Sequence, residues 1–248
     1  IRDRRNIHIV ITAQTNFGNG YPERNIQTGG FSYKYDKCDM HSNPEAIAAQ
    51  ETYLRDLVKH TNPYTGLAYK DDPSIVGFEI NNEPCHSGTK EEVKAYINRM
   101  LKSMSKAGNR KPVFYNVSHN GYVAEAYYET TVQGTTYQWY PIGLVSGQTQ
   151  QGNFLPYVDR YDIPFAGKVK EFNKKARMIY EFDPADIMYS YMYPAMVRTF
   201  RTAGFQWITQ FAYDPIDLAF ANTEYQTHFL NLAYTPNKAM SMKIAAEA

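Results

Sequence analysis

Residues 75–84 read IVGFEINNEP, and this stretch decides how the rest of the chain is interpreted. Residues 75–80 form a short, nearly continuous apolar run, which is typical of a strand buried on both faces. Glu79 lies inside this strand, where we expect an inward-pointing, hydrogen-bonded structural role. Glu83 follows just past the strand end. A carboxylate there is costly unless it is paired, hydrogen-bonded or used in chemistry, so Glu83 is either a cap or ion-pair residue or part of a functional site.

Short apolar runs followed by helical patterns recur along the chain. Further strands are expected at 7–13, 112–117, 136–141, 176–182 and 205–211. Amphipathic helices are expected from Pro44, after the capping box at 89–92, at 189–203 and from Pro236, with a short helix at 123–130. Alternation of buried strands with helices predicts the parallel sheet of an α/β protein.

Six strand–helix units are visible, whereas a closed (β/α)8 TIM barrel has eight strands. We predict such a barrel, with strands 3 to 8 in this chain and strands 1 and 2 missing. Residues 1–248 would then form one catalytic barrel domain that is incomplete at its N-terminus. The alternative is an open doubly wound sheet, but no glycine-rich phosphate loop follows any predicted strand. The segment 143–167 is too long for a simple connection and is a candidate wall of a cleft.

Composition excludes several classes of protein. The 248 residues include 26 Lys and Arg against 25 Asp and Glu, so the chain lacks the basic excess typical of a nucleic-acid-binding protein. No apolar stretch is long enough for a membrane span. The two cysteines, Cys38 and Cys85, fit no metal-ligand spacing, and neither a metal nor a cofactor is expected. Whether they form a disulfide bond stays open, because sequence does not give the separation of their Cα atoms.

A second carboxylate ends another predicted strand. Residues 180–184 read YEFDP, which puts Glu181 at the end of the strand at 176–182. Parallel barrels collect their catalytic groups at the carboxyl ends of the strands, so Glu83 and Glu181 are expected on the same face. Asp183 and Asp186 are expected to cap the helix that follows.

Asn82-Glu83-Pro84 after a strand resembles the Asn-Glu-Pro signature of clan A glycoside hydrolases, the family 5-like (β/α)8 barrels. The segment at 62–75 also resembles the lead-in to that strand in bacterial members. The resemblance implies that Glu83 is the acid/base on strand four and Glu181 the nucleophile on strand seven of a retaining enzyme. It also implies that Asn82 contacts the 2-hydroxyl of the sugar.

Other substrate-binding residues are expected from the same resemblance. A strand-six tyrosine commonly touches the nucleophile in this family, and Tyr140 is the first choice, with Tyr137 as the alternative. Gln138 occupies a place where the family often has histidine, and this is a departure from the pattern. Trp207 is the candidate for the strand-eight tryptophan under the sugar. Position alone, and not the resemblance, makes three more residues candidates for the cleft: His86 just beyond Glu83, and Asn16 and His119 after predicted strands, where loop capping is the alternative role of the last two.

The sequence therefore predicts a retaining glycoside hydrolase that cleaves β-glycosidic bonds in a β-mannan, β-glucan or β-galactoside. The alternative function is a non-catalytic glycan-binding barrel. The expected partner is a carbohydrate, and the oligomeric state is not predicted. The substrate class favours a secreted or periplasmic protein, although no signal segment is visible in this chain.

Overall fold

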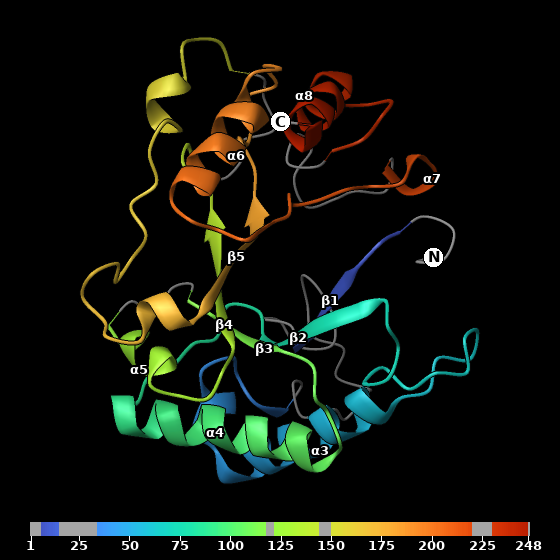
Figure 1. Cartoon of the computed structure of the whole chain (residues 1–248), viewed down its shortest axis with the longest axis vertical. Coiled ribbons are helices and arrows are strands. Elements are labelled where there is room, and N and C mark those ends of the chain that lie inside the picture. Colours follow the sequence, from blue (N-terminus) through green and yellow to red (C-terminus); the bar gives the residue numbers. More distant parts are fainter. Residues whose placement is uncertain (1–5, 15–33, 118–121, 144–149, 220–229, 248) are drawn as a thin grey trace. The chain divides into compact units, whose positions relative to one another are not determined.

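The structure is a computed structural model that describes residues 6–14, 34–117, 122–143, 150–219 and 230–247. It divides into two compact units (Figure 1). Unit 1 comprises Ile1–Thr136 with Gly167–Lys175, and unit 2 comprises Tyr137–Ala166 with Ala176–Ala248. Each unit is described by itself.

The described strands follow the predicted alternation. They are β1 (Ile9–Gln14), β2 (Ile75–Asn81), β3 (Val113–Asn116), β4 (Gly134–Trp139), β5 (Ala176–Phe182) and β6 (Trp207–Ile208). Their order in the sheet is the order of the chain, and the described pairings are parallel. This singly wound order is that of a (β/α) barrel, and it excludes the doubly wound alternative, in which the strand order reverses.

Two long helices pack together in unit 1: α3 (Pro44–Lys59) and α4 (Lys90–Lys106). Asn43 caps α3 through its side-chain oxygen, and Pro44 opens the helix. The predicted capping box of α4 is confirmed, because Thr89 and Glu92 satisfy each other's backbone N–H groups. The shorter helical segments of this unit are η1 (Asp39–His41), α5 (Glu125–Tyr128) and η3 (Phe172–Lys174).

Gly77 allows β2 and β3 to approach closely. A Cβ at this position would lie 3.1 Å from the Phe114 ring and 3.2 Å from the Pro112 carbonyl oxygen. Phe78 and Ile80 of the same strand are fully buried. The glycine therefore serves packing at the centre of the stretch 75–84.

Unit 2 contains α6 (Met192–Thr202) and α8 (Pro236–Glu247), which pack against each other, together with η2 (Leu155–Tyr157) and α7 (Ile216–Ala219). Its core is aromatic: Phe200 of α6 contacts the rings of Phe182, Phe205 and Trp139. Aromatic residues make up 15% of the sequence, and in this unit they serve packing.

Two expectations about unit 2 need correction. The run at 205–211 forms only the two-residue strand β6, although Thr209 and Phe211 still donate backbone hydrogen bonds to β5. Helix α8 buries Lys238, Ser241 and Ala245, while the apolar Met240 and Ile244 are exposed. The pattern of apolar residues in the sequence therefore does not predict which face of α8 is packed.

Candidate active site

The carboxyl end of β2 begins with a buried carboxylate. Glu79 is fully buried and accepts hydrogen bonds from Thr12 Oγ1 of β1, at 2.8 Å, and from Thr136 Oγ1 of β4. These contacts satisfy the charge inside the sheet. The predicted structural role of Glu79 is confirmed.

Beyond β2 the backbone places Asn82 and Glu83 at the strand end. Asn82 N–H donates to the carbonyl oxygen of Gln14 at 2.9 Å, which continues the pairing with β1. Glu83 has φ of 46°, in the left-handed region that residues other than glycine seldom adopt. Such a conformation costs on the order of 1–3 kcal/mol and is concentrated at functional sites. Both side chains are partly exposed.

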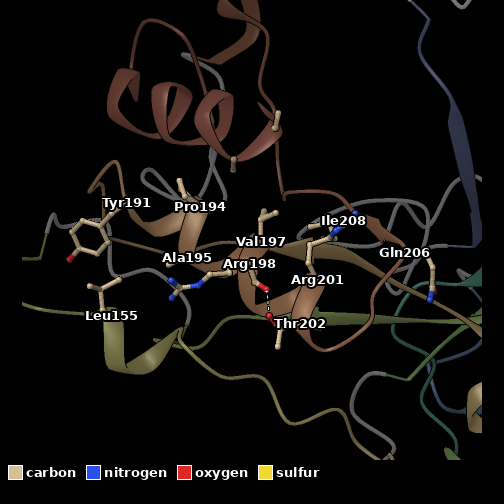
Figure 2. A pocket seen from close by; sticks show the side chains of 12 residues that line it. Leu155, Tyr191, Pro194, Ala195, Val197, Arg198, Arg201, Thr202, Gln206 and Ile208 are labelled. Atoms are coloured by element: carbon tan, nitrogen blue, oxygen red, sulfur yellow. Dashed lines mark hydrogen bonds between the residues drawn. The ribbon is translucent and has the colours of Figure 1, made fainter. Parts of the chain in front are cut away.

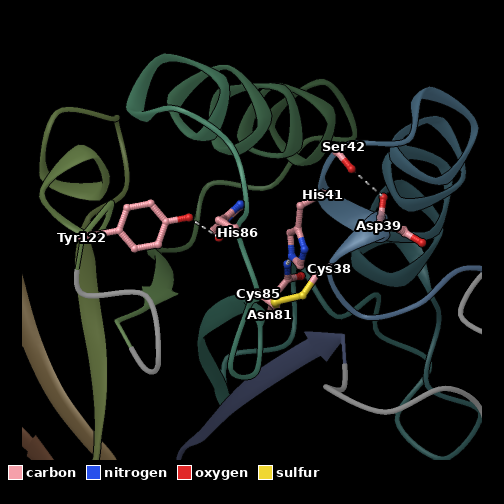
Figure 3. The surroundings of a disulfide bond; sticks show 8 residues. All are labelled: Cys38, Asp39, His41, Ser42, Asn81, Cys85, His86 and Tyr122. Carbon is pink, nitrogen blue, oxygen red and sulfur yellow. Dashed lines mark hydrogen bonds between the residues drawn. A yellow bond between two sulfur atoms is a disulfide. The ribbon is translucent and has the colours of Figure 1, made fainter.

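A disulfide bond joins Cys38 to Cys85, two residues after Glu83, with the Cα atoms 4.7 Å apart (Figure 3). It ties the segment before α3 to the segment that carries Glu83. Lys37 precedes Cys38 and is half-buried; burial lowers the pKa of its ammonium group, and the negative charge of Glu83 opposes that shift. The disulfide therefore keeps a cation near Glu83, a feature that the sequence pattern did not reveal.

His86, three residues after Glu83, is buried among aromatic side chains. Its Nε2 is 2.7 Å from the hydroxyl oxygen of Tyr115, and its ring centroid lies 4.4 Å from that of His41. Figure 3 shows the side chains of His41 and His86 near the disulfide bond. The pKa of His86 is lowered to about 2, mainly by burial and in addition by the nearby His41. His86 also lines a cavity of about 440 Å³ next to α4. Because its ring is committed to this packing, we leave His86 out of the proposed sugar contacts.

The carboxyl end of β5 carries the second site. Tyr140, one residue past β4, donates a hydrogen bond of 2.5 Å to Glu181 Oε1. Gln138 Nε2 donates to the hydroxyl oxygen of Tyr180 at 2.9 Å and makes a weaker contact of 3.4 Å with Glu181 Oε2. Gln138 and Tyr140 are two residues apart, so strand alternation puts both on one face. Hydrogen bonds to both oxygens stabilise the ionised form of Glu181.

The structure does not bring two other predicted residues to Glu181. Tyr137 is buried, and its ring packs against Phe205. Trp207 pairs with Met178, three residues before Glu181 on β5. At about 3.3 Å per residue this is a separation of about 10 Å along the strand, and an odd spacing also puts the two side chains on opposite faces. Asn16 and His119 lie outside the described residues.

A cavity of about 890 Å³ in unit 2 lies beside α6 (Figure 2). Arg198, Arg201 and Gln206 supply polar groups to it, and the described residues that line it include no carboxylate. This cavity therefore lacks the groups that acid/base chemistry needs, in contrast to the strand end at Glu181. In the described part of the chain, no cluster of three or more His, Cys, Asp or Glu side chains is arranged to hold a metal ion.

We compared the chain with protein-family models, curated proteins and solved structures. No family model matches the chain. The hyperthermostable endo-1,4-β-D-mannanase of Thermotoga petrophila superposes with a TM-score of 0.70 at 14% identity, over 99% of this chain and 77% of that one. A glycoside hydrolase family 5 mannosidase from Rhizomucor miehei superposes with a TM-score of 0.66 at 14% identity, over 99% of this chain and 74% of that one.

The chain has the fold of the family 5 glycoside hydrolases. This confirms the predicted resemblance. In addition, a segment of 64 residues is 31% identical to mannan endo-1,4-β-mannosidase 3 of Arabidopsis thaliana. This segment makes up 25% of this chain and 16% of that protein. In barrels of this kind active sites lie at the carboxyl ends of the strands, where Glu83 and Glu181 each stand. The described helices include none with the length and apolar character of a membrane span.

Proposed function

We propose that the chain is the catalytic part of a retaining β-glycosidase, and that its six strands are strands 3 to 8 of an eight-stranded barrel. The observation that carries the proposal is the hydrogen bond from Tyr140 to Glu181 at a strand end of a family 5 fold. The left-handed backbone of Glu83, also at a strand end, supports it.

The proposed reaction is a double displacement. The Glu181 carboxylate attacks the anomeric carbon, the bond from that carbon to the leaving oxygen breaks, and Glu83 donates its proton to that oxygen. The ionised Glu83 then takes a proton from a water molecule as the water oxygen attacks the anomeric carbon. The bond between the sugar and Glu181 breaks, and its electron pair returns to the carboxylate. Asn82 would hold the sugar 2-hydroxyl.

We further propose a β-1,4-linked mannan as substrate, because the similar proteins described above are named as mannanases or mannosidases. The disulfide between Cys38 and Cys85 supports a secreted or periplasmic location, since disulfide bonds persist in oxidising compartments.

The direct test is hydrolysis of β-1,4-mannan, β-1,4-glucan and aryl β-galactosides by the full-length protein, with the anomeric form of the first product followed by NMR. Release of the β-anomer from mannan is the expected result. Initial release of the α-anomer would rule out retention. Binding to mannan without hydrolysis would favour the non-catalytic glycan-binding barrel.

Replacing Tyr140 by phenylalanine is expected to lower kcat by about 10- to 100-fold, because a hydrogen bond to a charged group contributes about 1.5–3 kcal/mol. Loss of this donor raises the pKa of the nucleophile, so the acid limb of the kcat/KM profile shifts to higher pH. The check is a pH profile on an aryl β-mannoside. An unshifted acid limb with unchanged kcat would show that Tyr140 has no such role.

Replacing Glu83 by alanine is expected to lower kcat/KM on mannan by about 10²- to 10⁴-fold, the usual contribution of a general acid. The loss should be much smaller on a 2,4-dinitrophenyl mannoside, whose leaving group needs no proton. The matched control is Glu91→Ala, which changes an exposed residue of α4. Equal losses on the two substrates would contradict the acid role.

A further inference from the structure

Asp183, two residues after Glu181, is a fully buried carboxylate that is held from three directions in unit 2. Tyr193 of α6 donates its hydroxyl to Oδ1 at 2.6 Å, and Lys238 of α8 donates from Nζ to Oδ2 at 2.8 Å. Gln210 Nε2 makes a longer contact of 3.4 Å with Oδ1. The expected role of Asp183 as a helix cap is wrong, because α6 begins only at Met192.

Lys238 is as deeply buried as its partner; both side chains are at most 1% exposed. Burial lowers the pKa of Lys238, with the attraction of Asp183 and Asp186 opposing the shift. Burial likewise raises the pKa of Asp183 to about 6, against the effect of Lys238. The desolvation of the two charges is therefore only partly offset by their attraction, which makes the pair an inefficient device for stability alone.

The position of the pair suggests another use. Before Asp183, the end of β5 is held by the segment that follows β6, in which the Phe211 N–H donates to the carbonyl oxygen of Phe182 at 3.1 Å. After Asp183 come Pro184 and Ala185, and Ala185 has φ of 52°, so the chain turns away from the strand. Asp183 is thus the last side chain anchored before the turn. Its ion pair with Lys238 holds the chain two residues after Glu181, just past the end of β5.

We propose that Lys238 is a positioning residue for Glu181, and that it acts through its buried ion pair with Asp183. The inference rests on the proposed function, in which Glu181 is the nucleophile. Three donors that converge on one carboxylate restrict its direction more than apolar packing would. Displacement of a reacting group by about 1 Å can cost about 100-fold in rate.

The test uses inactivation of the full-length protein by 2,4-dinitrophenyl 2-deoxy-2-fluoro-β-mannoside, with kinact and Ki measured separately. Lys238→Met leaves Asp183 buried without its cation and is expected to lower both Tm and kinact. Asp183→Asn/Lys238→Met removes both charges, and such neutral replacements often recover stability. We expect Tm to return toward the wild-type value while kinact stays about 10- to 100-fold low and Ki is unchanged. All rates are measured well below the Tm of each variant.

The matched control is Lys243→Met, also on α8, whose ammonium group is exposed and pairs with Glu247; its kinact should equal that of the wild type. If kinact recovers together with Tm in the double variant, or is unchanged in Lys238→Met, the pair is only structural and the inference fails. If the wild type itself gains no label at Glu181, the proposed function fails first. The two failures are therefore distinguishable.

Discussion

Glu181→Ala is expected to lower kcat by about 10⁴-fold or more, because losing an enzyme's nucleophile removes the reaction path and not only part of its stabilisation. In the folded protein the carboxylate is partly exposed at the strand end, with Tyr140 and Gln138 bonded to its oxygens. Its removal leaves those donors accessible to water, so the variant should fold.

The measurement is kcat on an aryl β-mannoside with and without added azide. Azide can enter the space left by the side chain and attack the anomeric carbon, which yields an α-glycosyl azide. The control is Glu171→Ala, since Glu171 pairs only locally among its described contacts, with Lys174. A Glu181→Ala variant with more than about a tenth of wild-type kcat would exclude Glu181 as nucleophile.

Acid should destabilise unit 1 through His86. In the folded protein the pKa of His86 is lowered to about 2, below the ordinary value of 6.5, mainly by burial. A depressed folded-state pKa gives stability that is complete above pH 6.5 and is lost as pH falls, because only the unfolded chain takes up the proton. Between pH 7 and pH 4 this single group should cost about 3 kcal/mol. His41, with its pKa lowered to about 4, acts in the same direction.

The measurement compares urea unfolding of the wild type and His86→Gln across this pH range. The difference in unfolding free energy, wild type minus variant, should fall by about 3 kcal/mol between pH 7 and pH 4. A pH-independent difference for His86→Gln would mean that His86 takes up its proton as readily in the folded protein as in the unfolded chain, and would contradict the account.

The sequence predicted most of the fold because a short apolar run in the sequence marks each strand. The run at 176–182 is the strand β5, and β1 to β4 each lie within about two residues of their predicted bounds. The exceptions depend on distant partners. Residues 205–211 form a two-residue strand, and the packed face of α8 contains Lys238, a buried lysine that forms an ion pair with the remote Asp183.

The residues of the candidate site likewise fall into those that a local sequence pattern identifies and those that distant contacts place. Glu83, Glu181 and Tyr140 carry local signals, because each stands at or just past the end of an apolar run. Lys37 and Lys238 carry none, since a lysine in a loop or on a helix usually reads as solvent-exposed. Their places are set by a disulfide that spans 47 residues and by an ion pair between residues 55 apart. Contacts between residues so far apart along the chain leave no local pattern by which a single sequence would reveal them.

The central claim, that Glu181 forms a covalent bond to the sugar, is tested most directly by intact-mass spectrometry. The full-length protein is incubated with 2,4-dinitrophenyl 2-deoxy-2-fluoro-β-glycosides of mannose, glucose and galactose, and any adduct is mapped by peptide sequencing. The account predicts a stable adduct on Glu181 that forms fastest with the mannoside. An adduct on another residue, or none from any of the sugars with folded protein that hydrolyses mannan, would contradict it.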